Sequence, residues 1–194
     1  MLNELLKKST SKEHEELEGI MLTKKIFEES FNLSDYKQVL LTNYEIHRLI
    51  EENISNALDI EIQSRLNIKN RRKLPALIKD LEEAQIEPDK KNENHIIIPQ
   101  FKTNSEALGA MYVLEGAMLG GNVILKQLRK MDVFKNLSLT YYSLYGAGLR
   151  ENWISFIHEL NTSVSDEEAC LHKAKEVFHL YAQVAQRNIY STLK

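Results

Sequence analysis

The sequence predicts one all-helical domain that spans residues 1–194. Apolar residues recur at spacings of three and four along most of the chain, which is the periodicity of amphipathic helices. The only strand-like run, at residues 95–98, is too short to build a sheet. No internal repeat, low-complexity tract or linker divides the sequence, and its length suits one domain with a substantial core.

In the first half of the chain we expect helices at residues 2–19, 34–58 and 71–84, followed by a loop at 86–104. Ser34 is the expected N-cap of the second helix. Pro75 is tolerated because it falls in the first turn of the third helix. The loop assignment rests on a polar run that holds two of the three prolines.

In the second half we expect helices at residues 105–131, 149–160 and 166–190. The "YGAG" turn at residues 145–148 precedes the middle one, whose buried side carries Trp153, Phe156, Ile157 and Leu160. Ser165 and Glu168 have the spacing of a capping box, which predicts the start of the last helix.

Composition and charge exclude several classes of protein. The net charge is −3, with lysines spread among acidic residues, so we expect no nucleic-acid partner. The single cysteine, Cys170, excludes an internal disulfide framework and a multi-cysteine metal site. The first residues lack an uninterrupted apolar segment and the sequence reaches Lys194 without an apolar tail, so we expect a cytoplasmic protein.

Residues 107–125 are apolar enough to suggest a membrane span, and Gly116 and Gly120 form a GxxxG pair within them. Glu115 is the only charged residue in this stretch. A carboxylate at mid-span costs roughly 2.5–3.5 kcal/mol on insertion scales. We therefore expect a central helix buried by its neighbours and no membrane partner.

His14 is a candidate metal ligand because Glu18 lies one helical turn further on, where its carboxylate could hold one imidazole nitrogen. The other nitrogen would then be free to bind a metal. Lys7 lies two turns before His14 on the same face, about 10 Å away by helix rise, with Thr10 between them. The alternative is a surface histidine with a weak ion pair to Glu18.

Three glycines interrupt the helix expected at residues 105–131. Each glycine costs about 0.8–1.0 kcal/mol relative to alanine, so Gly116, Gly120 and Gly121 together cost roughly 2.5–3 kcal/mol. Gly116 and Gly120 share a face, and the Gly120–Gly121 pair is a natural kink point. Either another helix or a flat ligand packs against the bare backbone, and spacing alone favours a helix.

Other candidate sites are excluded or assigned to the surface. The sequence holds no GxGxxG, P-loop or CxxCH motif, which argues against a bound dinucleotide, a bound nucleoside triphosphate and a covalently attached c-type heme. The Glu51–Glu52 and Glu82–Glu83 pairs lack the ExxH pattern of di-iron bundles and are expected on solvated faces. We also expect His172 and His179 at or near the surface and Cys170 as a buried apolar residue.

Two motifs, "LKKSTSKEHEELE" at residues 6–18 and "YVLEGAMLGGNVI" at residues 112–124, together resemble the heme oxygenases, and most closely their soluble bacterial biliverdin-producing branch. The first contains the family's L-K-x-x-T-x-x-x-H pattern, and the second resembles its glycine-rich distal helix. The "YGAG" turn followed by Trp153 and Phe156 also fits the bacterial pattern. The resemblance covers most of the chain, from Leu6 to about Leu160.

The resemblance implies a heme oxygenase-like bundle that holds heme between the first helix and a kinked, glycine-rich distal helix. Heme b would be both cofactor and substrate, with His14 as the ligand of its iron and Glu18 behind that histidine. Lys7 would meet a propionate. The expected contacts of heme are Lys7, Thr10, His14, Glu18, Gly116, Ala117, Gly120, Gly121 and Arg150, with His14, Gly116 and Gly120 catalytic.

The resemblance further implies a reaction of heme with O2 that yields biliverdin, CO and ferrous iron. Because the sequence has no flavin or nicotinamide motif, a ferredoxin or flavoprotein reductase is the implied electron donor.

One departure from the animal enzymes is Ala117, which stands where they carry an aspartate that anchors a proton-delivering water network. Ala117 keeps open a second hypothesis, a non-catalytic heme or tetrapyrrole carrier. A third is a relative that shares the fold but binds another ligand, as thiaminase-type proteins do, for which His14 would be dispensable.

Overall fold

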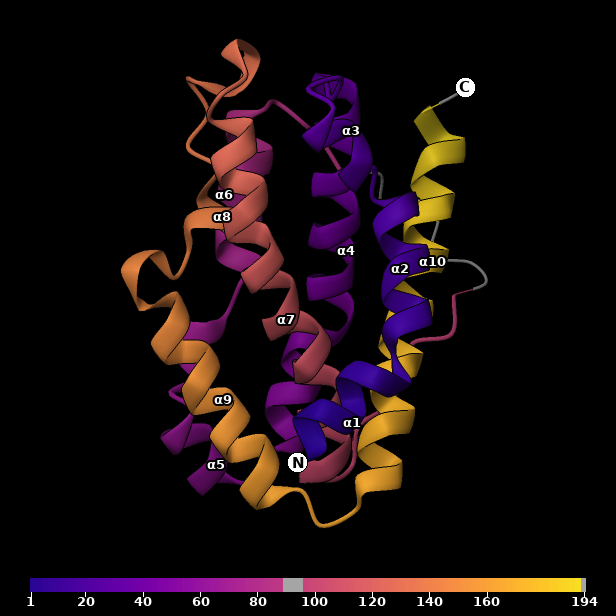
Figure 1. Cartoon of the computed structure of the whole chain (residues 1–194), viewed down its shortest axis with the longest axis vertical. Helices are drawn as coiled ribbons and strands as arrows, with labels where there is room; N and C mark the ends of the chain where they lie inside the picture. The colour runs from indigo at the N-terminus through magenta and orange to yellow at the C-terminus, as the bar shows by residue number, and fades with distance from the viewer. Residues whose placement is uncertain (89–95, 193–194) are drawn as a thin grey trace.

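The structure is a computed structural model that describes residues 1–88 and 96–192. These residues form helices, turns and loops without a strand, which confirms the predicted fold class (Figure 1). Residues 96–98 of the strand-like run are irregular, and His95 lies outside the described residues. Residues 89–94 of the predicted loop also lie outside the described residues. The rest of this loop, up to the helix that starts at Asn104, is irregular chain with a bend at Thr103.

The first predicted helix is in fact two helices, α1 (Leu2–Ser9) and α2 (Ser11–Ile20). The chain changes direction at Thr10, whose φ and ψ of −111° and 9° are not helical (Figure 1). The Thr10 hydroxyl donates to the Leu6 carbonyl at 2.8 Å, a contact that bends helices. The prediction that Lys7 and His14 share the face of one straight helix is therefore wrong.

After the short α3 (Thr23–Phe27) comes the long α4 (Leu33–Ala57). The N-cap of α4 is Asn32 rather than the predicted Ser34. The Asn32 side chain accepts from the backbone N–H groups of Ser34 and Asp35, and Asp35 accepts from the Asn32 N–H. This reciprocal arrangement is a capping box, and it satisfies helix-terminal donors that a cap at Ser34 would leave free.

The middle of the chain continues with α5 (Ile60–Arg65), the 3₁₀ turn η1 (Ile68–Arg71) and α6 (Leu74–Glu83). The third helix therefore begins at Leu74, three residues after the predicted start at residue 71, because residues 68–71 form the 3₁₀ turn. Pro75 lies in the first turn of α6, as predicted.

The glycine-bearing helix is α7 (Asn104–Leu128), which Thr103 and Glu106 begin with a capping box. It stays α-helical through all three glycines, so the predicted kink does not interrupt its secondary structure. The turn η2 (Asp132–Phe134), the short α8 (Thr140–Ser143) and the turn η3 (Gly146–Gly148) follow.

The chain closes with α9 (Leu149–Ser163) and α10 (Glu167–Thr192). On α9, Phe156 and Leu160 are buried, while Trp153 and Ile157 are partly buried against the same core. At the start of α10, the Asp166 carboxylate accepts from the Ala169 N–H, so Asp166 and not Ser165 provides the cap.

Two apolar clusters form the core, and α4 and α7 pass through both. The first half of α7, from Ala107 to Leu114, packs with α1, α9 and α10 and with Ile46, Ile50 and Ile54 of α4. Met118 and Leu128 of α7 pack with α3, α6, α8 and the beginning of α4. Residues 115–117 of α7 therefore lie between the two clusters.

The expectation that α7 is a central helix is confirmed by its contacts with α3, α4, α8, α9 and α10. Among the described helices, α7 alone is long and apolar enough to cross a membrane. Half of its most apolar 18-residue stretch is buried inside the protein. The carboxylate of Glu115 is buried and paired with cations.

Candidate functional site

The glycines of α7 have different surroundings near its start and in its middle. A Cβ on Gly109 would lie 2.1 Å from the Cys170 carbonyl oxygen of α10, so only glycine allows this contact. One built on Gly116 or Gly120 would have no neighbouring atom of the described chain within 4 Å. The alternative that spacing alone favoured, a helix packed against Gly116 and Gly120, is therefore wrong. Their backbone faces open space.

The separation of α7 from α10 accounts for this difference. Gly109, Gly116 and Gly120 lie on one helical face, since they are spaced by seven and four residues. Both helices start at the lower end of the molecule in Figure 1 and move apart upward, with α2 lying along α10. The face of α7 that packs on α10 at Gly109 is thus uncovered at Gly116.

Gly121 and Ala117 lie on other faces of α7. A Cβ on Gly121 would come within 3.0 Å of the Tyr142 ring, so this glycine makes room for α8. Ala117 is half-buried. Of the three predicted glycines, only Gly116 and Gly120 therefore offer bare backbone to a ligand.

His14 lies on α2 with 61% of its side chain exposed. Its Nδ1 is 3.6 Å from a Glu18 carboxylate oxygen, an ion-pair distance too long for a hydrogen bond. The Phe178 ring of α10 meets the imidazole edge to face, with centroids 6.1 Å apart. With Nδ1 turned toward Glu18, Nε2 is the nitrogen available to a metal.

The other predicted contacts lie around these helices in varied environments. Lys7 on α1 and Arg150 at the start of α9 are exposed. Thr10 is buried, with its hydroxyl bonded to the Leu6 carbonyl, so the structure gives it the role of bending the chain between α1 and α2. Ligand contact by these three residues stays a prediction.

Behind α7, Glu115 holds a buried cluster of charges. Its carboxylate accepts from Arg71 Nη1 at 2.7 Å, from Lys73 Nζ, and from the Tyr145 hydroxyl at 2.9 Å. The side chains of Glu115, Arg71 and Lys73 are each at most 3% exposed. Arg71 also donates to the Leu66 and Asn152 carbonyls, so every charge in the cluster is paired.

The cluster continues into α4 through Glu51. The Glu51 carboxylate accepts from the backbone N–H groups of Lys73 and Leu74 and lies 3.3 Å from His47 Nδ1. Burial alone would raise the pKa of Glu51, but these hydrogen bonds outweigh it and lower the pKa. The prediction of a solvated face is therefore wrong for Glu51, whereas Glu52 is exposed as predicted.

His47 is completely buried, and its Nε2 has no hydrogen-bond partner in the described part of the chain. Burial lowers its pKa, with Glu51 opposing the shift, so the imidazole is neutral at neutral pH. The Tyr141 ring lies 5.8 Å from the His47 ring. Tyr141 and Tyr181 both donate to the Asn43 side-chain oxygen.

We call these side chains the buried polar network: Asn43, His47, Glu51, Arg71, Lys73, Glu115, Tyr141, Tyr145 and Tyr181. Burial raises the pKa of its three tyrosines, and the Glu115 charge raises that of Tyr145 further. These hydroxyls therefore stay protonated and act as donors.

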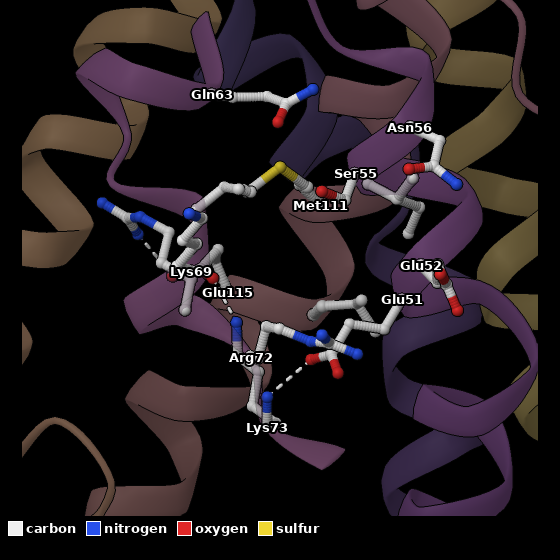
Figure 2. A pocket seen from close by; sticks show the side chains of 14 residues that line it. Glu51, Glu52, Ser55, Asn56, Gln63, Lys69, Arg72, Lys73, Met111 and Glu115 are labelled. Atoms are coloured by element: carbon white, nitrogen blue, oxygen red, sulfur yellow. Dashed lines mark hydrogen bonds and ion pairs between the residues drawn. The ribbon is translucent and has the colours of Figure 1, made fainter. Parts of the chain in front are cut away.

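A cavity of about 210 Å³ borders the network between α4, η1 and α7 (Figure 2). Glu51, Lys73 and Glu115 line its polar side, and Met111 and Leu114 of α7 lie on its apolar side. The cavity is partly open, so the network, buried as it is, reaches a space accessible to solvent.

Sequence reasoning missed this network although two signals pointed to it. A lone carboxylate in an otherwise apolar helix requires buried cationic partners, yet Glu115 served only as an argument against a membrane span. His47 follows Asn43 by four residues and precedes Ile50 by three, which places it on the buried face of α4.

The remaining candidates behave as predicted. His172 and His179 are exposed on α10, and His172 Nε2 lies 3.2 Å from Glu176. Cys170 is buried, which raises the pKa of its thiol to about 12. Within residues 1–88 and 96–192, no group of three histidine, cysteine or acidic side chains is placed to hold a metal ion. A single ligand such as His14 is enough for heme iron.

The heme oxygenase family model matches residues 1–187 of this chain. Among solved structures, the NO- and CO-bound heme oxygenase from Neisseria meningitidis is similar, with a TM-score of 0.77 and 19% sequence identity. The match covers 97% of this chain and 92% of that one. No curated protein matches the sequence.

Proposed function

Because this chain belongs to the heme oxygenase family, we propose that it binds heme b and cleaves it oxidatively to biliverdin, CO and ferrous iron. Bound heme would supply the iron that binds O2 and the porphyrin carbon that is oxidised. The electrons would come from a ferredoxin or flavoprotein reductase, in a cytoplasmic setting. The observation that carries the proposal is the uncovered glycine backbone at Gly116 and Gly120.

The residues on the two sides of the proposed site fit a flat macrocycle. Gly116 and Gly120 leave one face of α7 without side chains, so a planar ring could lie against the backbone. On α2, Glu18 stands near Nδ1 of His14, so Nε2 is the nitrogen that would bind iron. In this arrangement His14 would hold the iron, and Lys7 and Arg150 would pair with propionates.

The buried polar network supports a route for protons where Ala117 lacks a carboxylate. The neutral His47 ring carries one proton, which lies at Nδ1 while Glu51 is ionised and at Nε2 when a protonated Glu51 donates to Nδ1. Nε2 has no hydrogen-bond partner in the described chain. His47 Nδ1 is tied to Glu51, which lines the cavity behind α7. We infer that, after Glu51 takes a proton from the cavity, His47 gives up its Nε2 proton as Nδ1 receives the proton of Glu51, so that one proton moves from the cavity into the interior of the protein.

The experiment adds hemin to the purified protein, then a reductant and air, and follows the absorption spectrum. We expect a histidine-ligated Soret band that disappears as biliverdin absorption grows. A persistent Soret band without biliverdin would instead identify a heme carrier, and absence of heme binding would contradict both functions.

His14→Ala should abolish turnover while the far-ultraviolet circular dichroism stays unchanged. The matched control is His172→Ala, because His172 is also exposed and also pairs with a glutamate four residues later. Turnover unchanged in His14→Ala would remove this residue as the iron ligand and favour a relative with another ligand.

In the same assay, His47→Gln should bind heme normally but turn over slowly, because the proposed proton route is interrupted. Normal turnover in this variant would exclude that route.

A further inference from the structure

The helix that carries His14 is weakly anchored. All ten residues of α2 are described, and none of them is buried. Buried apolar side chains normally fix the position of a helix, so α2 must be held by its partly buried contacts. Those contacts are mainly with α10, which begins 147 residues after the end of α2.

Two contacts join α10 to α2 at His14. Lys175 Nζ lies 3.7 Å from a carboxylate oxygen of Glu13, the residue before the histidine. Three residues further along α10, the Phe178 ring meets the His14 ring at an interplanar angle of 69°. Lys175 and Phe178 are on one face of α10, since residues three apart are neighbours on a helix surface.

These contacts restrict different motions. The Glu13 side chain of the ion pair is 17% exposed, less than that of Lys175. Because the pair links α2 to α10, it opposes rotation of α2 about its axis. Phe178 is 5% exposed and belongs to the first apolar cluster, so its ring is a fixed surface. An edge-to-face contact with that surface restricts the imidazole more firmly than the exposed Glu18 does.

The same helix also determines where α7 lies, through the contact between Gly109 and Cys170. Cys170, Lys175 and Phe178 are within nine residues of one another on α10. Both sides of the proposed site, the glycine face of α7 and the histidine of α2, are therefore placed by one rigid element.

We propose that Lys175 and Phe178 are positioning residues that set the orientation of the His14 imidazole for iron binding. The proposal rests on the proposed function in that His14 is the iron ligand. Neither residue is proposed as a ligand of the iron. Each acts through α2, by holding Glu13 or the imidazole ring.

The first test uses the heme-free protein and needs no assumption about heme. We expect Phe178→Leu to shift the NMR resonances of the His14 ring, because the ring current of Phe178 is lost. The control is Phe134→Leu, which removes another buried ring, from the second apolar cluster. Unshifted His14 resonances in Phe178→Leu would overturn the proposed contact.

The second test measures heme binding by titration of the Soret band. Phe178→Leu should weaken binding roughly two- to ten-fold, the range for an aromatic pair. It should also shift the iron–histidine stretching band in the resonance Raman spectrum of the ferrous complex. Phe134→Leu should leave that band unchanged, since a loss of stability alone does not reorient His14.

A charge swap tests the ion pair. Glu13→Lys and Lys175→Glu should each weaken heme binding about two- to five-fold, and the double variant should restore it. The control is Lys12→Glu, which makes the same charge change at a pair within α2, Lys12 and Glu16. Failure of the double variant to recover would contradict the role of Lys175.

The outcomes separate this inference from the proposed function. If His14→Ala binds heme like the wild type, the ligand assignment fails, while the NMR comparison still decides whether Phe178 orients the ring. If His14 is the ligand and the iron–histidine band is the same in Phe178→Leu and wild type, the positioning role fails alone.

Discussion

Gly109 and Gly116 lie on the same face of α7, two turns apart, but protein packing requires a glycine only at Gly109. Gly109 is required by protein packing, because the α10 backbone occupies the place of its side chain. Gly116 has no such neighbour among the described residues, so protein packing does not explain why the helix carries a glycine there in place of the more stabilising alanine. A glycine stripe therefore does not identify its partner, and only the surroundings of each position do.

The contrast also depends on what holds α7 in place. Around Gly109 the helix is packed into the first apolar cluster, whereas next to Gly116 it is tied from behind by Glu115. A buried ion-pair cluster can hold a helix at a point where one of its faces is not covered by protein. Three substitutions test this comparison.

The largest effect is expected for Glu115→Gln. The substitution removes the negative charge that Arg71 and Lys73 share, and leaves two buried cations without a counter-charge. We expect the free energy of unfolding to fall by about 3–5 kcal/mol, as measured by urea denaturation. The matched control is Glu61→Gln, whose carboxylate is 83% exposed beside Arg65 and should matter by less than about 0.5 kcal/mol. Equal effects of the two variants would show that the charge cluster does not hold α7.

Gly109→Ala comes next. The new methyl group would lie 2.1 Å from a backbone oxygen, so α10 must move away from α7. We expect a loss of about 1–3 kcal/mol in unfolding free energy, the usual cost of overpacking. Gly19→Ala on α2 is the control, because nothing lies within 4 Å of its Cβ among the described residues. A stable Gly109→Ala variant would remove the distinction between the two glycines.

The smallest effect on stability, with the opposite sign, is expected for Gly116→Ala. Because a Cβ there has free space, helix propensity should raise the unfolding free energy by up to about 1 kcal/mol. The same methyl group would occupy the proposed ligand surface, so heme titration should show weaker binding. A destabilised Gly116→Ala variant with normal heme binding would reverse our interpretation of this face.

Most helices were predictable because their signals are local. The periodicity of α4, α7, α9 and α10 lies within each segment, and their positions agree with the predictions to within a few residues. Prediction failed where a neighbouring side chain competed for the same role. Asn32 rather than Ser34 caps α4, Asp166 rather than Ser165 caps α10, and the Thr10 hydroxyl divides the first helix.

The sequence pattern could predict the histidine and glycines of the candidate site but not the buried polar network behind them. His14 with Glu18, and Gly116 with Gly120, are pairs at helical spacing, so each could be recognised within one segment. The two cationic partners of Glu115 lie 44 and 42 residues earlier in the chain, and the tyrosines that donate to Asn43 come from α8 and α10. Such pairings have no periodicity in the sequence, and no local pattern reveals them.

Residue spacing alone was therefore sufficient to predict an all-helical protein and to nominate a histidine and two glycines as separate candidates, which only the family resemblance joined into one site. It also suggested the wrong reason for those glycines, a packed helix. The direction in which α10 leaves α7 decides which glycine is covered, and that direction depends on contacts between residues far apart in the sequence, such as Gly109 and Cys170, which are 61 residues apart. Helix formation depends on near neighbours, whereas the space beside a helix depends on every element that packs around it.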